Sequence, residues 1–81
     1  MVLKSIKLRD GEDFITLGVL LKIAGIIDTG GQAKIFLSEN SALINGEEDN
    51  RRGRKLYHGD KIVVLNQSFI IDWYADQRIV P

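Results

Sequence analysis

The fold is decided by residues 16–46, which read TLGVLLKIAGIIDTGGQAKIFLSENSALING. Thr16 is a good N-cap for a helix, because its side-chain oxygen can accept a hydrogen bond from the first turn. Apolar residues recur after it at helical spacing, and these are Leu17, Leu20, Leu21 and Ala24. Gly25 follows directly, where a helix commonly ends in a left-handed residue. The pattern predicts a first helix of about two turns.

A second helix start follows a few residues later. Residues 29–32, TGGQ, match the capping-box pattern, because Gln32 lies three residues after Thr29. The buried face of this helix is expected to carry Ala33, Phe36 and Leu37. Asn40 is expected to end it. The turn at residues 25–28 would then join the two helices into a compact pair.

The remainder of the chain predicts β-structure. Strands are expected at residues 2–8, 42–44, 47–50, 61–65 and 69–73. Asn45-Gly46 is a strong tight-turn signal, and further turns are expected at residues 9–13, 58–60 and 66–68. Residues 74–81 show no strong pattern. Capped helices followed by strands predict an α+β fold, with two short packed helices against a small, mostly antiparallel sheet.

Length and composition limit the function classes. The chain has 81 residues, enough for a single domain over residues 1–81. It has no cysteine, which excludes a disulfide framework, a thiolate metal site and a cysteine nucleophile. No apolar run approaches the length of a membrane span, and residues 1–4 show no secretory signal. We therefore expect a cytoplasmic protein with no membrane partner.

The distribution of charge is more informative than its sum. The chain has eleven basic and eleven acidic residues, so any nucleic-acid function must depend on where the charges lie. Four of the five residues in the basic loop, residues 51–55, are cationic: Arg51, Arg52, Arg54 and Lys55. A polyanion would relieve their mutual repulsion, and the planar fork of arginine suits phosphate. The alternative is a solvated hairpin neutralised by the acidic residues at 47–49.

The glycine pair at the start of the second helix is the other candidate. Glycine in a first helical turn costs about 1 kcal/mol relative to alanine, so two in a row need a reason. Gly30 and Gly31 would let a phosphate approach the unpaired N–H groups of that turn, with Lys34 one turn further on. Lys22, which is polar within the apolar first helix, could point the same way. The alternative is that the glycines only relieve a tight turn between helices.

The residues offer little to support an enzyme. His58 is the only histidine, and no paired-carboxylate site, catalytic triad or dinucleotide fingerprint is present. The acidic run at residues 47–49 lacks the spacing of a calcium loop. Trp73 and Tyr74 could stack on a base or close the core. We expect no catalytic activity, no metal site, no cofactor and no small-molecule substrate.

Several segments together resemble the S4-like RNA-binding domain, also called the alpha-L motif. They are residues 15–18, 21–22, 30–31, 33–34, 36–39, 49–57 and 59–60, and residues 49–57, DNRRGRKLY, are the most specific of them. The resemblance covers a core of about residues 15–72 and is closest to the small stand-alone bacterial proteins of the YaaA type. It implies a face that holds RNA, made by the second helix and the adjoining β loops. Mapped onto this chain, that face comprises Lys22, Thr29, Gly30, Gly31, Gln32, Lys34, Arg51, Arg52, Arg54 and Lys55.

The resemblance also implies a function. It predicts a non-catalytic, ribosome-associated module that holds structured RNA, with ribosomal RNA as the candidate. Two alternatives stay open. The Gly59-Asp60 turn before an apolar strand also occurs in protein-interaction modules of the β-grasp type. An assembly factor that contacts protein rather than RNA is the other.

Overall fold

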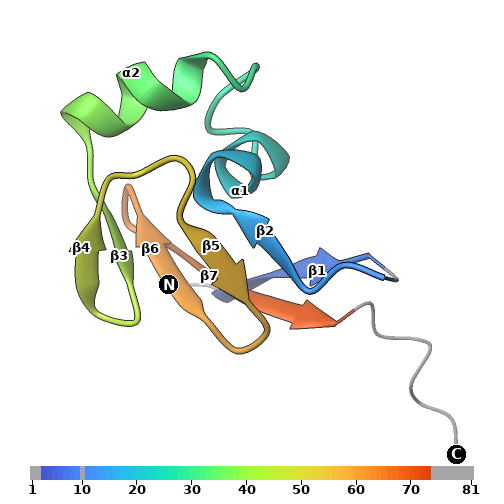
Figure 1. Ribbon diagram of the computed structural model, residues 1–81. Helices are drawn as coiled ribbons and strands as arrows, with labels where there is room; N and C mark the ends of the chain where they lie inside the picture. Colours follow the sequence, from blue (N-terminus) through green and yellow to red (C-terminus); the bar gives the residue numbers. More distant parts are fainter. Residues whose placement is uncertain (1–2, 10, 74–81) are drawn as a thin grey trace, which may run out of the picture.

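The computed structural model describes residues 3–9 and 11–73 and has the predicted α+β architecture (Figure 1). The elements are β1 (Leu3–Leu8), β2 (Phe14–Thr16), α1 (Leu17–Ile23), α2 (Gln32–Glu39), β3 (Ala42–Ile44), β4 (Glu47–Asp49), β5 (Lys55–Tyr57), β6 (Lys61–Val64) and β7 (Gln67–Trp73). The sequence predictions for position 2, position 10 and residues 74–81, including Tyr74, lie outside the described residues. None of the helices in the described part is long and apolar enough to cross a bilayer.

The main sheet is mostly antiparallel, as predicted. Its strand order is β1-β7-β6-β3-β4, and β2 pairs with β5 in a separate antiparallel ribbon. β1 is the exception in the main sheet, since it pairs with β7 in parallel, with Ile6 opposite Ile71. Parallel neighbours need a long crossover connection, and here almost the whole chain lies between the two strands.

The core lies between the helix pair and the strands. Figure 1 shows both helices on one side of the strands, with α1 next to the β2–β5 ribbon. The largest fully buried side chains come from every layer and are Phe69, Leu8, Leu17, Leu20, Leu21, Ile44, Leu56, Ile62, Ile71 and Val64. Burial of apolar area is the dominant favourable contribution to folding, so this shared core fixes how the helices and the ribbon pack together.

Helix α1 begins and ends as predicted. Thr16 is its N-cap, and the Thr16 hydroxyl accepts a 3.3 Å hydrogen bond from the backbone N–H of Val19. The C-cap is Ala24, and Gly25 follows with φ +78°, the left-handed conformation that glycine adopts without strain.

The start of α2 differs from the prediction. The helix begins at Gln32, and Gly31 is an N-cap with helical φ of −67° and no capping side chain. Gly30 and Gly31 therefore precede the helix, in a tight turn where the N–H of Gln32 donates to the carbonyl oxygen of Thr29 at 3.1 Å. Only half of the expected capping box forms: Gln32 Oε1 accepts from the N–H groups of Asp28 and Thr29, at 2.6 and 3.1 Å. One side-chain oxygen thus satisfies two backbone donors, and this takes the place of a hydroxyl cap.

The strands differ from the prediction mainly in two places. The ribbon strands β2 and β5 were not predicted, and their pairing takes Lys55 out of the expected loop and puts it opposite Thr16. The last hairpin turns at Leu65 and Asn66, whose φ angles are +51° and +65°, so β7 begins at Gln67 rather than at position 69. A leucine with positive φ gives no turn signal, since that conformation favours glycine and asparagine. The Asn45-Gly46 turn was predicted correctly, and its φ angles are +54° and +89°.

Candidate nucleic-acid interface

The backbone of the basic loop is fixed against the start of α1. The N–H of Leu17 donates to the carbonyl oxygen of Arg54 at 2.8 Å, and the N–H of Gly18 donates to that of Arg52 at 2.9 Å. The first N–H groups of a helix have no partner inside the helix, so the loop supplies two of the acceptors that α1 needs. The loop is therefore anchored at two points.

Gly18 is where α1, α2 and the basic loop meet. A Cβ placed on Gly18 would lie 3.4 Å from the carbonyl oxygen of Arg52 and 3.5 Å from the Cβ of Ala33 in α2. A methyl group would therefore just fit, and a larger side chain would push against the loop and α2. Sequence reasoning did not single out Gly18, although a glycine inside a helix usually marks a close approach.

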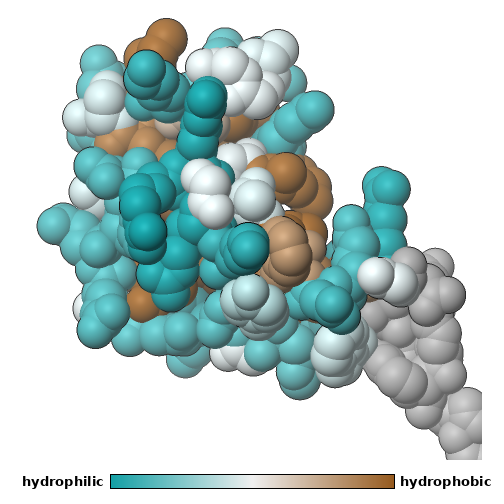
Figure 2. Space-filling view, in the orientation of Figure 1, coloured by the Kyte–Doolittle hydropathy of each residue, from teal (hydrophilic) through white to brown (hydrophobic). Residues whose placement is uncertain are grey.

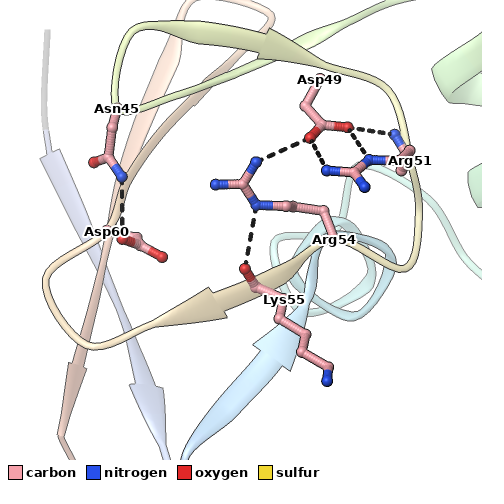
Figure 3. A network of polar contacts seen from close by, with 6 residues as sticks. All are labelled: Asn45, Asp49, Arg51, Arg54, Lys55 and Asp60. Carbon is pink, nitrogen blue, oxygen red and sulfur yellow. Dashed lines mark hydrogen bonds and ion pairs between the residues drawn. The ribbon is translucent and has the colours of Figure 1, made fainter.

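Asp49 is the carboxylate that organises the loop (Figure 3). Arg51 donates two hydrogen bonds to it, from Nε to Oδ1 at 3.1 Å and from Nη2 to Oδ2 at 2.8 Å. Arg54 Nη1 donates a third, to Oδ2 at 3.0 Å. The Asp49 side chain is only 9% exposed. The hydrogen bonds from Arg51, with a smaller contribution from Arg54, hold the pKa of Asp49 far below its usual range despite its burial. The same contact raises the pKa of Arg51.

This carboxylate changes the charge balance expected for the loop. Within residues 3–9 and 11–73, Asp49 is the acidic neighbour that makes ion pairs with the loop, and Glu47 and Glu48 make none. Arg51 and Arg54 are thus partly neutralised. Among the described residues, Arg52 and Lys55 form no ion pair, and Lys55 Nζ instead lies 5.0 Å from the centre of the Phe14 ring.

The start of α2 and the basic loop border one surface hollow. Gly30 lines it together with Arg52 and Gly53, and the other lining residues are Thr16, Gly18, Val19 and Ala33. A second hollow is lined by Arg51, Gly53, Arg54, Lys55, Tyr57 and Asp60. Gly53 borders both hollows, so the two adjoin at the basic loop. In Figure 2, hydrophilic surface covers the β4 and β5 side of the molecule, and an apolar patch lies beside it over α1 and β2.

The other residues expected at the site lie in different places. Lys34 is exposed in α2, one turn after Gly30. Gln32 lines a different hollow, together with Asp28 and Phe36, and its side-chain oxygen accepts hydrogen bonds from two N–H groups of the turn.

Lys22 and the two residues that flank Gly30 border neither hollow beside the loop. Lys22 borders a separate groove, which it shares with Lys7, Arg9 and Glu12. Thr29 and Gly31 adjoin Gly30 in the turn but line none of the hollows described above.

A helix pair on a mostly antiparallel sheet, with an arginine-rich loop held at the start of the first helix, defines a small S4-type domain. The S4 domain family model matches residues 6–72, and the chain belongs to that family. A similar protein is the probable ribosome maturation protein RlbA of Bacillus subtilis (strain 168). It is 58% identical to this chain over 52 residues, which are 64% of this chain and 73% of that protein. The predicted resemblance to small S4-like proteins is confirmed.

Proposed function

We propose that this chain is a non-catalytic RNA-binding module, one S4-like domain over residues 1–81 with a core of about residues 15–72. It holds structured RNA, with ribosomal RNA as the candidate, through the start of α2 and the arginine-rich loop. The observation that carries the proposal is that Gly30 and Arg52, 22 positions apart in the sequence, border one hollow. A phosphate there would meet the turn at Gly30 on one side and Arg52, which makes no ion pair among the described residues, on the other.

The charges of the face suit backbone contact with folded RNA. Arg52, Lys55 and Lys34 are exposed cations, while Arg51 and Arg54 share one carboxylate and keep a net positive charge. Phosphate contacts position a protein on RNA, and double-stranded RNA is recognised mainly by its shape. A chain with zero net charge can bind in this way because four of its eleven basic residues are gathered on one loop.

The relative supports a ribosomal target. A protein that is 58% identical over 52 residues is named a probable ribosome maturation protein. We therefore infer that ribosomal RNA, in mature or precursor particles, is the RNA to test first. A cytoplasmic location is consistent with that role.

Crosslinking in cells, followed by sequencing of the bound RNA, tests the proposal. Wild-type protein should enrich discrete segments of ribosomal RNA, and Arg52→Ala should lose that enrichment at equal protein abundance. Lys4→Ala is a matched control, since Lys4 is an exposed cation in β1 that borders neither hollow beside the loop. Equal crosslinking by wild type and Arg52→Ala, or no enrichment of ribosomal RNA, would contradict the proposed site or target.

An assembly factor that contacts protein is the second candidate. Val19 and Ile23 of α1 are 43% and 56% exposed, and both border the groove that contains Lys22. Exposed apolar side chains next to one another are typical of protein contacts. Membership of the S4 family favours RNA binding over a protein-contacting assembly factor and over an interaction module of the β-grasp type.

A further inference from the structure

The outer face of the β2–β5 ribbon carries an exposed aromatic pair. Phe14 lies directly opposite Tyr57 in the antiparallel register, and the next pair along, Ile15 and Leu56, faces the core. Because side chains alternate across a strand, both rings point outward. Phe14 is 37% exposed and Tyr57 is 48% exposed, and their ring centres are 5.7 Å apart with a tilt of 52°.

Cationic groups adjoin these rings on the side of the basic loop. Lys55 is the last residue of the basic loop, and its Nζ lies 5.0 Å from the centre of the Phe14 ring. Tyr57 also lines the second hollow, together with Arg51 and Arg54. A nucleotide whose base lay on the rings would therefore have arginine side chains nearby for its phosphate.

Charges of both signs border this hollow. Asp60 lines it, and its carboxylate accepts a 2.8 Å hydrogen bond from the N–H of Tyr57 and a 3.1 Å bond from Asn45 Nδ2. A carboxylate repels phosphate, so the part of the hollow next to Asp60 is unsuitable for the RNA backbone. A nucleobase is uncharged and has faces that stack on aromatic rings. The arginines thus suit a phosphate, and the exposed rings of Tyr57 and Phe14 suit the base attached to it.

We propose that Tyr57 and Phe14 form a stacking platform for one unpaired nucleobase, whose phosphate lies against Arg51 and Arg54. The inference rests on the proposed function and narrows its substrate class to RNA with an extruded nucleotide beside a duplex. A structural role for the pair is the competing explanation, because cross-strand aromatic pairs also stabilise a ribbon. Leucine separates the two roles, since it keeps an apolar side chain on the strand but offers no face for stacking.

The probe is an RNA duplex of about 16 base pairs, the span that modules for double-stranded RNA contact, with and without one bulged 2-aminopurine. Binding is followed by fluorescence anisotropy, and stacking is followed by quenching of the 2-aminopurine emission. Wild type should bind the bulged duplex at least about fivefold more tightly than the perfect one and should quench the probe. Tyr57→Phe should keep both properties. Tyr57→Leu should lose both while binding the perfect duplex as wild type does.

Phe14→Leu gives a second test on the other strand, and circular dichroism verifies that each variant is folded. Phe14→Leu should reduce the preference for the bulge in the same direction as Tyr57→Leu. If wild type binds both duplexes equally, or if the leucine variants keep the preference and the quenching, the stacking platform is overturned while RNA binding stands. If wild type binds neither duplex, the proposed function fails and this inference fails with it.

Discussion

The backbone N–H of Gly18, in the first turn of α1, donates a 2.9 Å hydrogen bond to the carbonyl oxygen of Arg52 in the basic loop. Arg52, whose side chain makes no ion pair within residues 3–9 and 11–73, therefore also provides an acceptor for the start of a helix. Leu17 and Arg54 repeat the arrangement one step away, at 2.8 Å. If the loop moved away from α1, two helix N–H groups would lose their acceptors. The position of the arginines therefore depends on the folded helix.

Gly18→Val should damage both stability and RNA binding. A Cβ at position 18 would already be in van der Waals contact with Arg52 and Ala33. The two γ-methyl groups of valine must therefore displace the loop or α2. Overpacking of this kind typically costs about 1–3 kcal/mol. Urea unfolding measures the loss in free energy, and anisotropy with a structured RNA measures the loss in affinity. Gly18→Ala is the control and should be as stable as wild type or more so, because alanine favours the helix. A valine variant with wild-type stability would show that the contact at Gly18 is loose.

Arg52→Ala should separate binding from stability. Within the described residues the Arg52 side chain makes no ion pair, and exposed charges usually contribute little to folding. We expect weaker RNA binding with a change in Tm of no more than a few degrees. Removing Arg51 and Arg54 together should behave differently, since it leaves the largely buried Asp49 carboxylate without its partners.

Asp49→Asn provides the matching rescue. The double variant Arg51→Ala, Arg54→Ala should lose roughly 1–2 kcal/mol of unfolding free energy through the unpaired carboxylate. Adding Asp49→Asn should recover part of that loss, because a neutral amide is cheaper to keep out of water than an isolated charge. Thermal unfolding of Asp49→Asn, the double variant and the triple variant, each compared with wild type, measures the coupling between Asp49 and the two arginines. Stability that stays at the wild-type level in the double variant would mean that the ion pairs serve only to orient the arginines.

Acid should weaken the wild-type protein through Asp49. Its pKa is lowered in the folded state, chiefly by the hydrogen bonds from Arg51, so its contribution is fully present above the unfolded value of about 3.9. That contribution is lost as the pH falls below this value. Unfolding free energy measured from about pH 5 to pH 3 should therefore decline more steeply in wild type than in Asp49→Asn. The pKa of Asp72 is also lowered, chiefly by the backbone N–H of Trp73, and comparison with the variant removes that shared contribution. Parallel curves would exclude Asp49 as a source of acid sensitivity.

Local chemistry explains what could be predicted from the sequence. Thr16, Gly25 and Asn45-Gly46 each act through their own backbone geometry, so a few neighbouring residues are enough to recognise a cap or a turn. The basic loop was identified because its charges are consecutive in the chain. The parallel pairing of β1 with β7 was not predictable in this way, because it joins strands about as far apart as the chain allows and leaves no local pattern.

The details of the site that were missed are also non-local. Asp49 belongs to an acidic run, and nothing in that run distinguishes the one carboxylate that turns towards the arginines. Phe14 and Tyr57 lie 43 positions apart, and strands of three residues are too short to show the alternation that would mark their outward faces. Gln32 was predicted as part of a capping box, and its side chain does reach back, but to two N–H groups of the turn.

The last prediction tests whether the α2 start and the basic loop bind one RNA backbone. Gly30 borders the hollow with Arg52, and a Cβ at Gly30 would meet nothing within 4 Å, so a side chain fits without strain. Gly30→Glu would place a negative charge where a phosphate is expected and should weaken binding about as much as the loss of one arginine. Gly30→Ala adds a methyl group without charge and should bind as wild type does. Gly31→Glu lies one residue further along and should weaken binding in the same direction but less severely.

Salt dependence supplies the independent measurement. If about four cationic side chains each neutralise a phosphate, log K should fall against log salt concentration with a slope of roughly −3 in wild type. Arg52→Ala should reduce the magnitude of that slope by about one, because one counterion fewer is released. Anisotropy titrations of one structured RNA at several salt concentrations yield both quantities for every variant. Two results would contradict the proposed face and show that the two sites act separately. One is equal RNA affinity of Gly30→Glu and Gly30→Ala at every salt concentration. The other is a wild-type slope close to zero.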